Sequence, residues 1–128
     1  MSAPNFVILY VDSPEQSGAF YAALFGRQPV EASSTFVLFV FDNGFKLGLW
    51  SCHTVEPAAR AAGGGAEVVI AVDAPATVDA THADWAARGL AIAQAPSDMD
   101  FGRTFVALDP DGHRLRVYRL NDTAGAQP

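Results

Sequence analysis

The sequence has few basic side chains and a single cysteine, and each shortage excludes a class of protein. Its 128 residues include 8 Lys and Arg against 14 Asp and Glu, which gives a formal net charge of −6 at pH 7. Proteins that bind nucleic acid need clustered Lys and Arg, so we expect no nucleic-acid partner. Because Cys52 has no second cysteine to pair with, an internal disulfide is excluded, and the composition is consistent with a reducing compartment.

Long apolar runs are also missing. The apolar run Phe6–Val11 stops at Asp12, whereas a helix that spans a membrane needs about 20 apolar residues. With no signal peptide at the N-terminus either, we expect a cytoplasmic protein without a membrane partner. What the chain does have is 50% apolar and 17% charged residues, the composition of an ordered globular domain.

The chain resembles itself in two places. The tetrapeptide Val11–Pro14 recurs as Val72–Pro75, and the turn and strand at residues 42–50 have a counterpart at residues 109–118. A repeat at a long period indicates the architecture before any single residue is interpreted. We therefore predict two copies of one βαβββ module. Their expected bounds are residues 5–51 and 66–120, with a connection at 52–65 and a frayed tail at 121–128.

The first copy is expected to contain a strand, a helix and three more strands. Phe6–Val11 has the continuous apolar pattern of a strand covered on both faces. A helix from Pro14 to Gly26 is expected to carry Phe20, Ala23 and Leu24 on one side. The remaining strands are expected at residues 28–32, 35–41 and 45–50.

The second copy is expected to follow the same order. A strand at 66–72 leads to an alanine-rich helix at 76–88 that buries Val78 and Trp85. The other expected parts are a strand at 90–95, a polar irregular loop at 96–101, a strand at 102–108 and a last strand that ends at Tyr118.

Two such modules, the pair Phe20-Tyr21 in the first helix and the turn Asp109–Gly112 before the last strand resemble the vicinal oxygen chelate superfamily. That superfamily includes glyoxalase I, extradiol dioxygenases, fosfomycin-resistance enzymes and bleomycin-binding resistance proteins. The resemblance covers about residues 5–120 and implies an α+β fold. In that fold, two tandem βαβββ modules form a cupped mixed β-sheet with helices on the outside and a ligand or metal inside the cup.

Strand alternation predicts which side chains point into the cup. If Leu115 and Val117 pack on a helix, the residues between and beside them point the other way. The same alternation, carried from one copy of the module to the other, predicts three inward residues in each of four strands. These are Arg114, Arg116 and Tyr118; Lys46, Gly48 and Trp50; Glu67, Val69 and Ala71; and Phe6, Ile8 and Tyr10.

Metal-dependent members of the superfamily place one ligand in each of four strands, and the resemblance maps those positions to Phe6, Gly48, Glu67 and Arg116. Of these only Glu67 has a donor atom, whereas a transition ion needs three or four converging donors and Arg is a permanent cation. We therefore expect no metal, no cofactor and no catalytic residue. Arg116 and Glu67 either pair with each other or hydrogen-bond a polar group of a ligand, because a buried unpaired charge is costly.

Aromatic side chains are the main candidates for ligand contact. Trp50 is either a core or dimer-contact residue or a stacking wall for a planar ligand. Phe39 is open to the same two interpretations, as lining or as ordinary core. The full candidate ligand-binding set is Trp50, Phe6, Tyr10, Glu67, Arg116, Phe39, Met99 and Phe101.

The adjacent pair Cys52 and His53 is not expected to act as a nucleophile and base, because neighbouring side chains on an extended segment point apart. His82 is expected to face solvent, and His113 to point away from the cup. The three histidines lack the spacing of a zinc site.

Within the superfamily, Leu49–Ser51, Glu67, Phe101–Phe105 and Asp109–His113 are most similar to the metal-free branch that confers phenazine resistance. This resemblance implies a homodimer that binds and sequesters a small planar aromatic compound without chemistry. One alternative is a glyoxalase-like lyase, isomerase or dioxygenase that uses a divalent ion. Another is a resistance or regulatory protein whose ligand is not aromatic.

Overall fold

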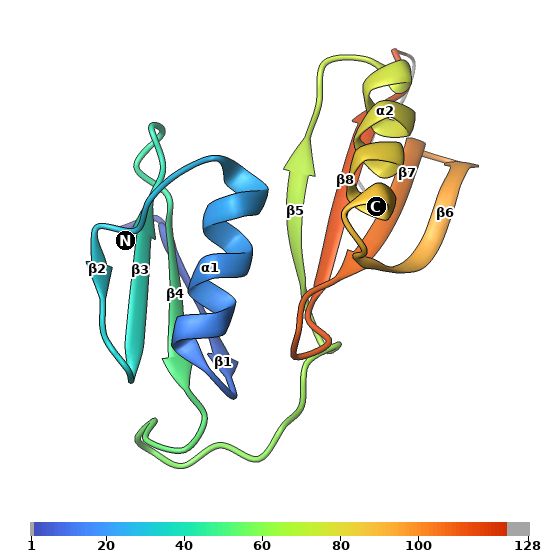
Figure 1. Ribbon diagram of the computed structural model, residues 1–128. Helices are drawn as coiled ribbons and strands as arrows, with labels where there is room; N and C mark the ends of the chain where they lie inside the picture. Colours follow the sequence, from blue (N-terminus) through green and yellow to red (C-terminus); the bar gives the residue numbers. More distant parts are fainter. Residues whose placement is uncertain (1, 123–128) are drawn as a thin grey trace. The chain divides into compact units, whose positions relative to one another are not determined.

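The computed structural model describes residues 2–122 and divides the chain between Ala62 and Gly63 into two compact units (Figure 1). We call residues up to Ala62 module 1 and those from Gly63 module 2. Each module is a βαβββ unit, so the α+β fold with two such modules is confirmed. The predicted frayed tail lies outside the described residues from residue 123 onward. Before that point Asn121 is held by its backbone amide, which donates to the Phe101 carbonyl at 2.8 Å.

Module 1 packs one helix on a four-stranded mixed sheet. Its strands lie in the order β1-β4-β3-β2, with β1 parallel to β4 and the other neighbours antiparallel. The elements are β1 (Phe6–Val11), α1 (Pro14–Phe25), β2 (Glu31–Ala32), β3 (Phe36–Val40) and β4 (Lys46–Ser51).

The helix α1 begins and ends as its sequence predicts. The Ser13 hydroxyl accepts a hydrogen bond from the Gln16 amide at 3.2 Å, and Gly26 closes the helix in the left-handed conformation with φ 59°. The buried side of the helix is formed by Ser17, Gly18 and Tyr21 instead of Phe20, Ala23 and Leu24. Gly18 explains the difference, because a Cβ there would lie 3.3 Å from the side chain of Val37 and the helix therefore approaches the sheet closely.

The two faces of this sheet differ. The face under α1 forms the core, and its buried residues are Leu9, Val11, Val37, Phe39, Leu47 and Leu49. On the other face Phe6, Ile8 and Tyr10 are 38%, 41% and 40% exposed. The prediction that the Phe6–Val11 strand is covered on both faces is therefore wrong, since alternate residues of the apolar run leave the core.

Module 2 repeats this arrangement in the strand order β5-β8-β7-β6, with β5 parallel to β8. Its elements are β5 (Glu67–Ala71), α2 (Pro75–Ala87), β6 (Ala91–Met99), β7 (Gly102–Leu108) and β8 (Arg114–Leu120). The prediction of a loop at 96–101 is wrong for residues 96–99, which extend β6. Register shifts between Ile92 and Gln94 and between Gln94 and Ser97 accommodate Pro96 in this edge strand.

The core of module 2 lies between α2 and β7–β8. Val78 and Trp85 are buried as predicted, and the Trp85 ring meets Phe105 edge-on at 5.4 Å. His82 also packs against Phe105, with the ring centroids 5.4 Å apart, so it is half-buried and does not simply face solvent. Within residues 2–122, neither helix has the length and apolar character needed to cross a membrane.

Candidate functional site

The helix-free face of module 1 is the sheet surface that α1 does not cover. Strand register places three rows of residues there, and each row runs across β1, β4 and β3. In one of these rows Tyr10 and Phe36 flank Trp50 on either side. The full set is Phe6, Ile8, Tyr10, Phe36, Leu38, Val40, Lys46, Gly48 and Trp50. The strand register that predicted Lys46, Gly48 and Trp50 on one face is therefore correct.

Aromatic rings dominate this face. The Phe36 and Trp50 rings meet at 88° with centroids 6.1 Å apart, and the Lys46 ammonium lies 5.8 Å from the centroid of Phe6. Gly48 sits beneath the rings. A Cβ at this position would lie 2.9 Å from both Phe36 Cζ and Phe6 Cε1, so the space where Gly48 would carry a side chain is occupied by aromatic carbon.

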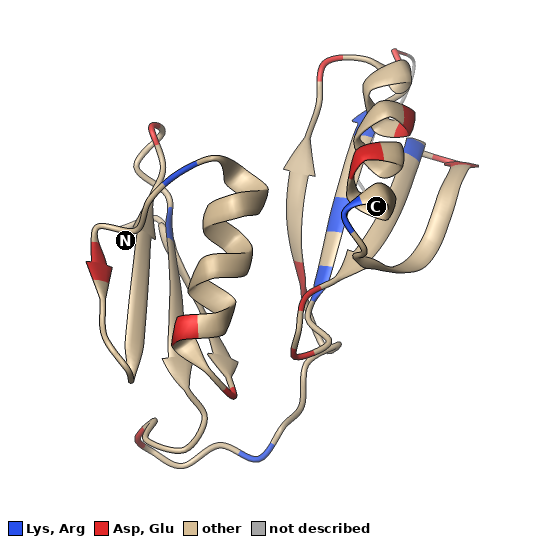
Figure 2. Cartoon of the chain, viewed as in Figure 1, with Lys and Arg blue, Asp and Glu red and all other residues tan. Residues whose placement is uncertain are grey.

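The helix-free face of module 2 is charged. Figure 2 shows basic residues along β8, and two of them, Arg114 and Arg116, lie on this face opposite Glu67 and Val69 of β5. Arg116 Nε donates to Glu67 Oε1 at 2.8 Å, and Arg116 Nη2 donates to Glu67 Oε2 at 3.1 Å. This bidentate geometry is the strongest form of an Arg–carboxylate pair.

Two polar groups complete the surroundings of Arg116. Its Nη1 donates to Gln94 Oε1 at 3.2 Å and to the Thr104 hydroxyl at 3.1 Å, so all three guanidinium nitrogens are bonded within module 2. The hydrogen bonds from Arg116 lower the pKa of Glu67, an effect that partial burial opposes and that the charges of Arg116 and Arg114 reinforce. Of the two alternatives left open by the sequence, the structure shows the Arg116–Glu67 pair.

These residues do not fit the metal that the superfamily implies. In module 1 the equivalent positions, Phe6 and Gly48, offer no donor, and rings fill the space above the glycine. In module 2 the Glu67 carboxylate already accepts two hydrogen bonds from Arg116, a cation that would repel a metal ion.

Three other candidates occupy different places. Phe39 is fully buried and pairs with Leu47 under α1, so it is ordinary core of module 1 and does not line the helix-free face. Phe101 is nearly buried at the β6–β7 turn, with its ring 6.4 Å from that of Tyr118. Met99 remains 43% exposed.

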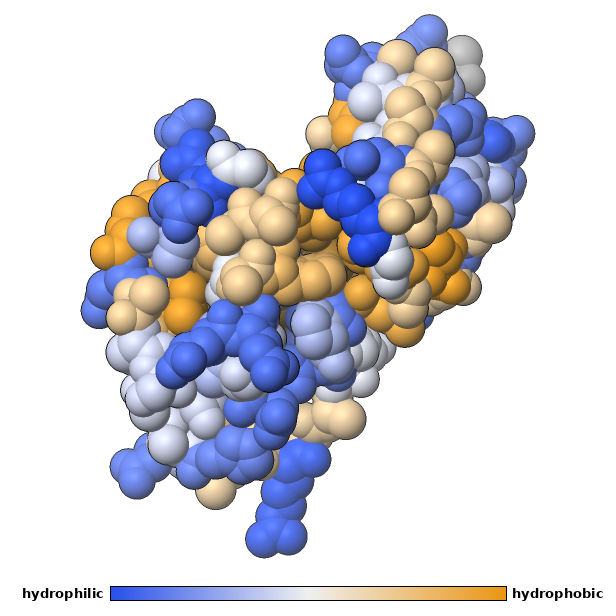
Figure 3. All heavy atoms as spheres, viewed as in Figure 1, coloured by the Kyte–Doolittle hydropathy of each residue, from blue (hydrophilic) through white to orange (hydrophobic). Residues whose placement is uncertain are grey.

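A hollow on module 1 lies on the α1 side. It has a volume of about 370 Å³ and runs between α1 and the segment around β2. Its lining includes Gly18, Ala22, Pro29, Ser33 and Val37, without an aromatic residue. The surface over α1 is mildly apolar (Figure 3), in keeping with exposed alanines on that helix. This hollow offers no ring on which a planar ligand can stack.

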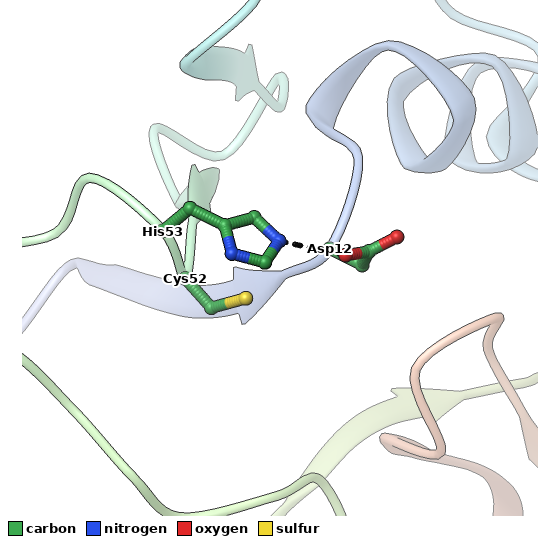
Figure 4. Close-up of side chains that lie close together, drawn as sticks. All are labelled: Asp12, Cys52 and His53. Atoms are coloured by element: carbon green, nitrogen blue, oxygen red, sulfur yellow. Dashed lines mark hydrogen bonds and ion pairs between the residues drawn. The ribbon is translucent and has the colours of Figure 1, made fainter.

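Sequence reasoning missed a cluster at the end of β4. Asp12, Cys52 and His53 each present one potential ligand atom, and these atoms lie within 4.8 Å of one another (Figure 4). The segment after Ser51 is a turn and is not extended, so the expected divergence of the Cys52 and His53 side chains is wrong. The sequence shows only that Cys52 and His53 are adjacent after a strand, and nothing in it brings Asp12 to them.

The Glyoxalase/Bleomycin resistance protein/Dioxygenase superfamily model matches residues 3–117. The phenazine antibiotic resistance protein EhpR of Enterobacter agglomerans is 31% identical over 121 residues, which cover 92% of each chain.

Solved structures agree with this match. The solution structure of protein ATC0852 from Agrobacterium tumefaciens is 57% identical, with a TM-score of 0.88 over 94% of this chain and 99% of that one. A glyoxalase/bleomycin resistance protein/dioxygenase from Nocardioides, 22% identical, shares the fold with a TM-score of 0.83 over 100% of this chain and 91% of that one. The chain belongs to the glyoxalase/bleomycin resistance protein/dioxygenase superfamily.

Proposed function

We propose that the protein binds a small planar aromatic compound of the phenazine kind and sequesters it without chemical conversion. The observation that carries this proposal is the aromatic helix-free face of module 1, where Trp50 lies between Tyr10 and Phe36. The similarity to EhpR, whose name records resistance to a phenazine antibiotic, supports the same class of ligand.

The side chains on the helix-free face of module 1 suit a flat apolar ligand. Phe6, Ile8 and Tyr10 keep roughly two-fifths of their surface exposed, so a ligand that covers them gains apolar burial. Stacking on an aromatic ring adds about 0.5–1.5 kcal/mol beyond the burial of area. Phe36 holds the Trp50 ring at a fixed angle and so reduces the entropy lost on binding.

Module 2 supports binding without catalysis. Arg116 pairs with Glu67, which Arg114 Nε also approaches at 3.1 Å, and Gln94 and Thr104 accept the two hydrogen bonds that Arg116 Nη1 donates. A group whose hydrogen bonds are already satisfied does not serve as a general acid or base without first breaking them. We assign to this network the role of a rigid polar surface.

Fluorescence quenching by a panel of phenazines tests the proposal. The chain has 2 Trp, so Trp85→Phe leaves Trp50 as the sole indole reporter, and Trp50→Ala leaves Trp85. We expect saturable quenching of Trp50 in Trp85→Phe and none of Trp85 in Trp50→Ala, because Trp85 is buried against Phe105. Affinity that is unchanged in Trp50→Ala, measured by calorimetry, would refute the assignment of the ligand to this face.

We also propose that the protein is a homodimer. A second subunit would cover the part of the apolar surface around Phe6, Ile8 and Tyr10 that a bound ligand leaves exposed, and monomers seldom leave such a surface uncovered. Closed two-fold dimers are the commonest soluble oligomers. Sedimentation equilibrium with and without a phenazine tests this, and a mass of one chain at micromolar concentration under both conditions would contradict it.

A further inference from the structure

The fold brings Asp12, Cys52 and His53 together at one edge of the module 1 sheet. The parallel β1–β4 ladder ends with Val11 opposite Ser51, and the Cys52 amide then donates to the Val11 carbonyl at 2.8 Å. Asp12 and Cys52 therefore leave adjacent strands at the same level. This placement depends on backbone hydrogen bonds within module 1 alone.

A turn aims the next side chain at the same point. The His53 amide donates to the Ser51 hydroxyl at 3.1 Å, and the amides of Thr54 and Val55 both donate to the Ser51 carbonyl. His53 Nε2 lies 2.7 Å from Asp12 Oδ1, and Figure 4 shows the Cys52 sulfur on the side of the ring that carries the other nitrogen.

The fold does not require these side chains. Module 2 has the same parallel strand register, since it pairs Ala71 with Tyr118 as module 1 pairs Tyr10 with Trp50. By the repeat, the residues that correspond to Cys52 and His53 are Leu120 and Asn121. In module 2 the strand continues through Leu120, which pairs with Gly102, so the βαβββ module forms there without this turn, a thiol or an imidazole.

We propose that Asp12, Cys52 and His53 bind one Zn²⁺ ion. Thiolate, imidazole and carboxylate are the ligand set of zinc, and three protein ligands leave a fourth position for water or another ligand. Ligands about 2.0–2.3 Å from a tetrahedral ion lie roughly 3.5 Å apart. The three donors already lie within 4.8 Å of one another, and they reach this spacing when the His53–Asp12 hydrogen bond opens and the imidazole turns one nitrogen toward both Asp12 and Cys52. Ligand softness favours zinc here over magnesium or calcium.

The proposed site is separate from the metal positions that the superfamily uses. Those positions correspond to residues within the strands, among them Phe6 and Gly48 in module 1. The zinc site instead lies in the turns that follow β1 and β4, where Cys52 is exposed and His53 and Asp12 have side chains that are 65% and 77% exposed.

Metal titration of the reduced, tag-free full chain tests the proposal. Co²⁺ alone should give a thiolate-to-metal charge-transfer absorption, and Zn²⁺ should displace it at one equivalent per chain. The variants Cys52→Ser, His53→Gln and Asp12→Asn should each weaken Zn²⁺ binding at least about tenfold. The matched controls, His82→Gln and Asp100→Asn, should bind as the parent does.

Alkylation of the thiol gives a second readout, taken at a Zn²⁺ concentration that saturates the parent chain and leaves His53→Gln unoccupied. Zn²⁺ should slow the reaction of Cys52 with iodoacetamide in the parent chain and leave the rate unchanged in His53→Gln. Binding that survives Cys52→Ser, absence of the cobalt absorption, or one ion shared by two chains in sedimentation would each overturn the proposed site.

Discussion

At the scale of single residues, Gly48 is a position on the helix-free face of module 1 that has no room for a side chain. A Cβ at Gly48 would lie 2.9 Å from the Phe6 and Phe36 rings, so Gly48→Ala must displace one of them. We expect the substitution to lower the free energy of unfolding by about 1–3 kcal/mol, the usual effect of overpacking. Urea denaturation measures the change. Gly65→Ala is the control, because a Cβ there meets nothing within 4 Å.

The pKa of Glu67 predicts a pH dependence of stability. Because Arg116 lowers that pKa from its ordinary value of 4.5, the carboxylate stabilises the fold above this pH, and the contribution is lost as pH falls through the lower folded-state pKa. Glu67→Gln should therefore be less stable than the parent at pH 7, with a difference that shrinks below about pH 4.5. Denaturation at a series of pH values measures the difference. A gap that stays constant, or a similar gap in Glu31→Gln, would contradict the role of the Arg116 pair.

At the scale of elements, the two helices differ in how they begin. Ser13 caps α1, whereas the equivalent residue before α2 is Ala74, which has extended backbone angles and makes no side-chain hydrogen bond. We expect Ala74→Ser to raise the free energy of unfolding by about 0.5–1 kcal/mol, since a serine hydroxyl here accepts a hydrogen bond from an amide of the first helical turn, as Ser13 does in α1. Thermal denaturation tests this, with Ala76→Ser as a control inside the helix. No gain over that control would show that the cap does not form.

Element order and strand register followed from the sequence, whereas details set by tertiary contact did not. The repeat and the alternation of β8 placed Arg116 and Trp50 on the correct faces, because strand geometry fixes side-chain direction locally. The orientation of α1 depends on how closely Gly18 approaches Val37, a contact that helix periodicity does not contain. Likewise, Pro96 indicated a loop, but an edge strand with register shifts accepts a proline.

The candidate site could be predicted from the sequence to a similar extent. The residue types at the superfamily's metal positions could be read from the repeat, and the pairing of Arg116 with Glu67 was one of two stated alternatives. The convergence of Asp12, Cys52 and His53 could not be read, because it depends on a turn that begins where the ladder ends. Hydrogen bonds to Ser51, distant in sequence from Asp12, set that geometry.

At the scale of the whole molecule, titration with divalent ions separates binding from the enzymatic alternative. We expect Glu67→Gln to leave Zn²⁺ binding unchanged and Cys52→Ser to weaken it, because the carboxylate is held by Arg116 and the thiol is exposed. Calorimetry with zinc, nickel, manganese and iron measures both variants. Binding lost in Glu67→Gln and kept in Cys52→Ser would favour a metal-dependent lyase, isomerase or dioxygenase.

Each module packs its helix on one side of its own sheet, against Phe39 in the first and against Phe105 in the second. Alternate residues of the same strands point away from the helix and do not take part in the helix–sheet packing. The two modules therefore combine the same backbone arrangement with different side chains there, aromatic rings in the first and a charged network in the second. Residues on the helix-free faces can therefore change to suit another ligand, while the packing of each helix on its sheet stays the same.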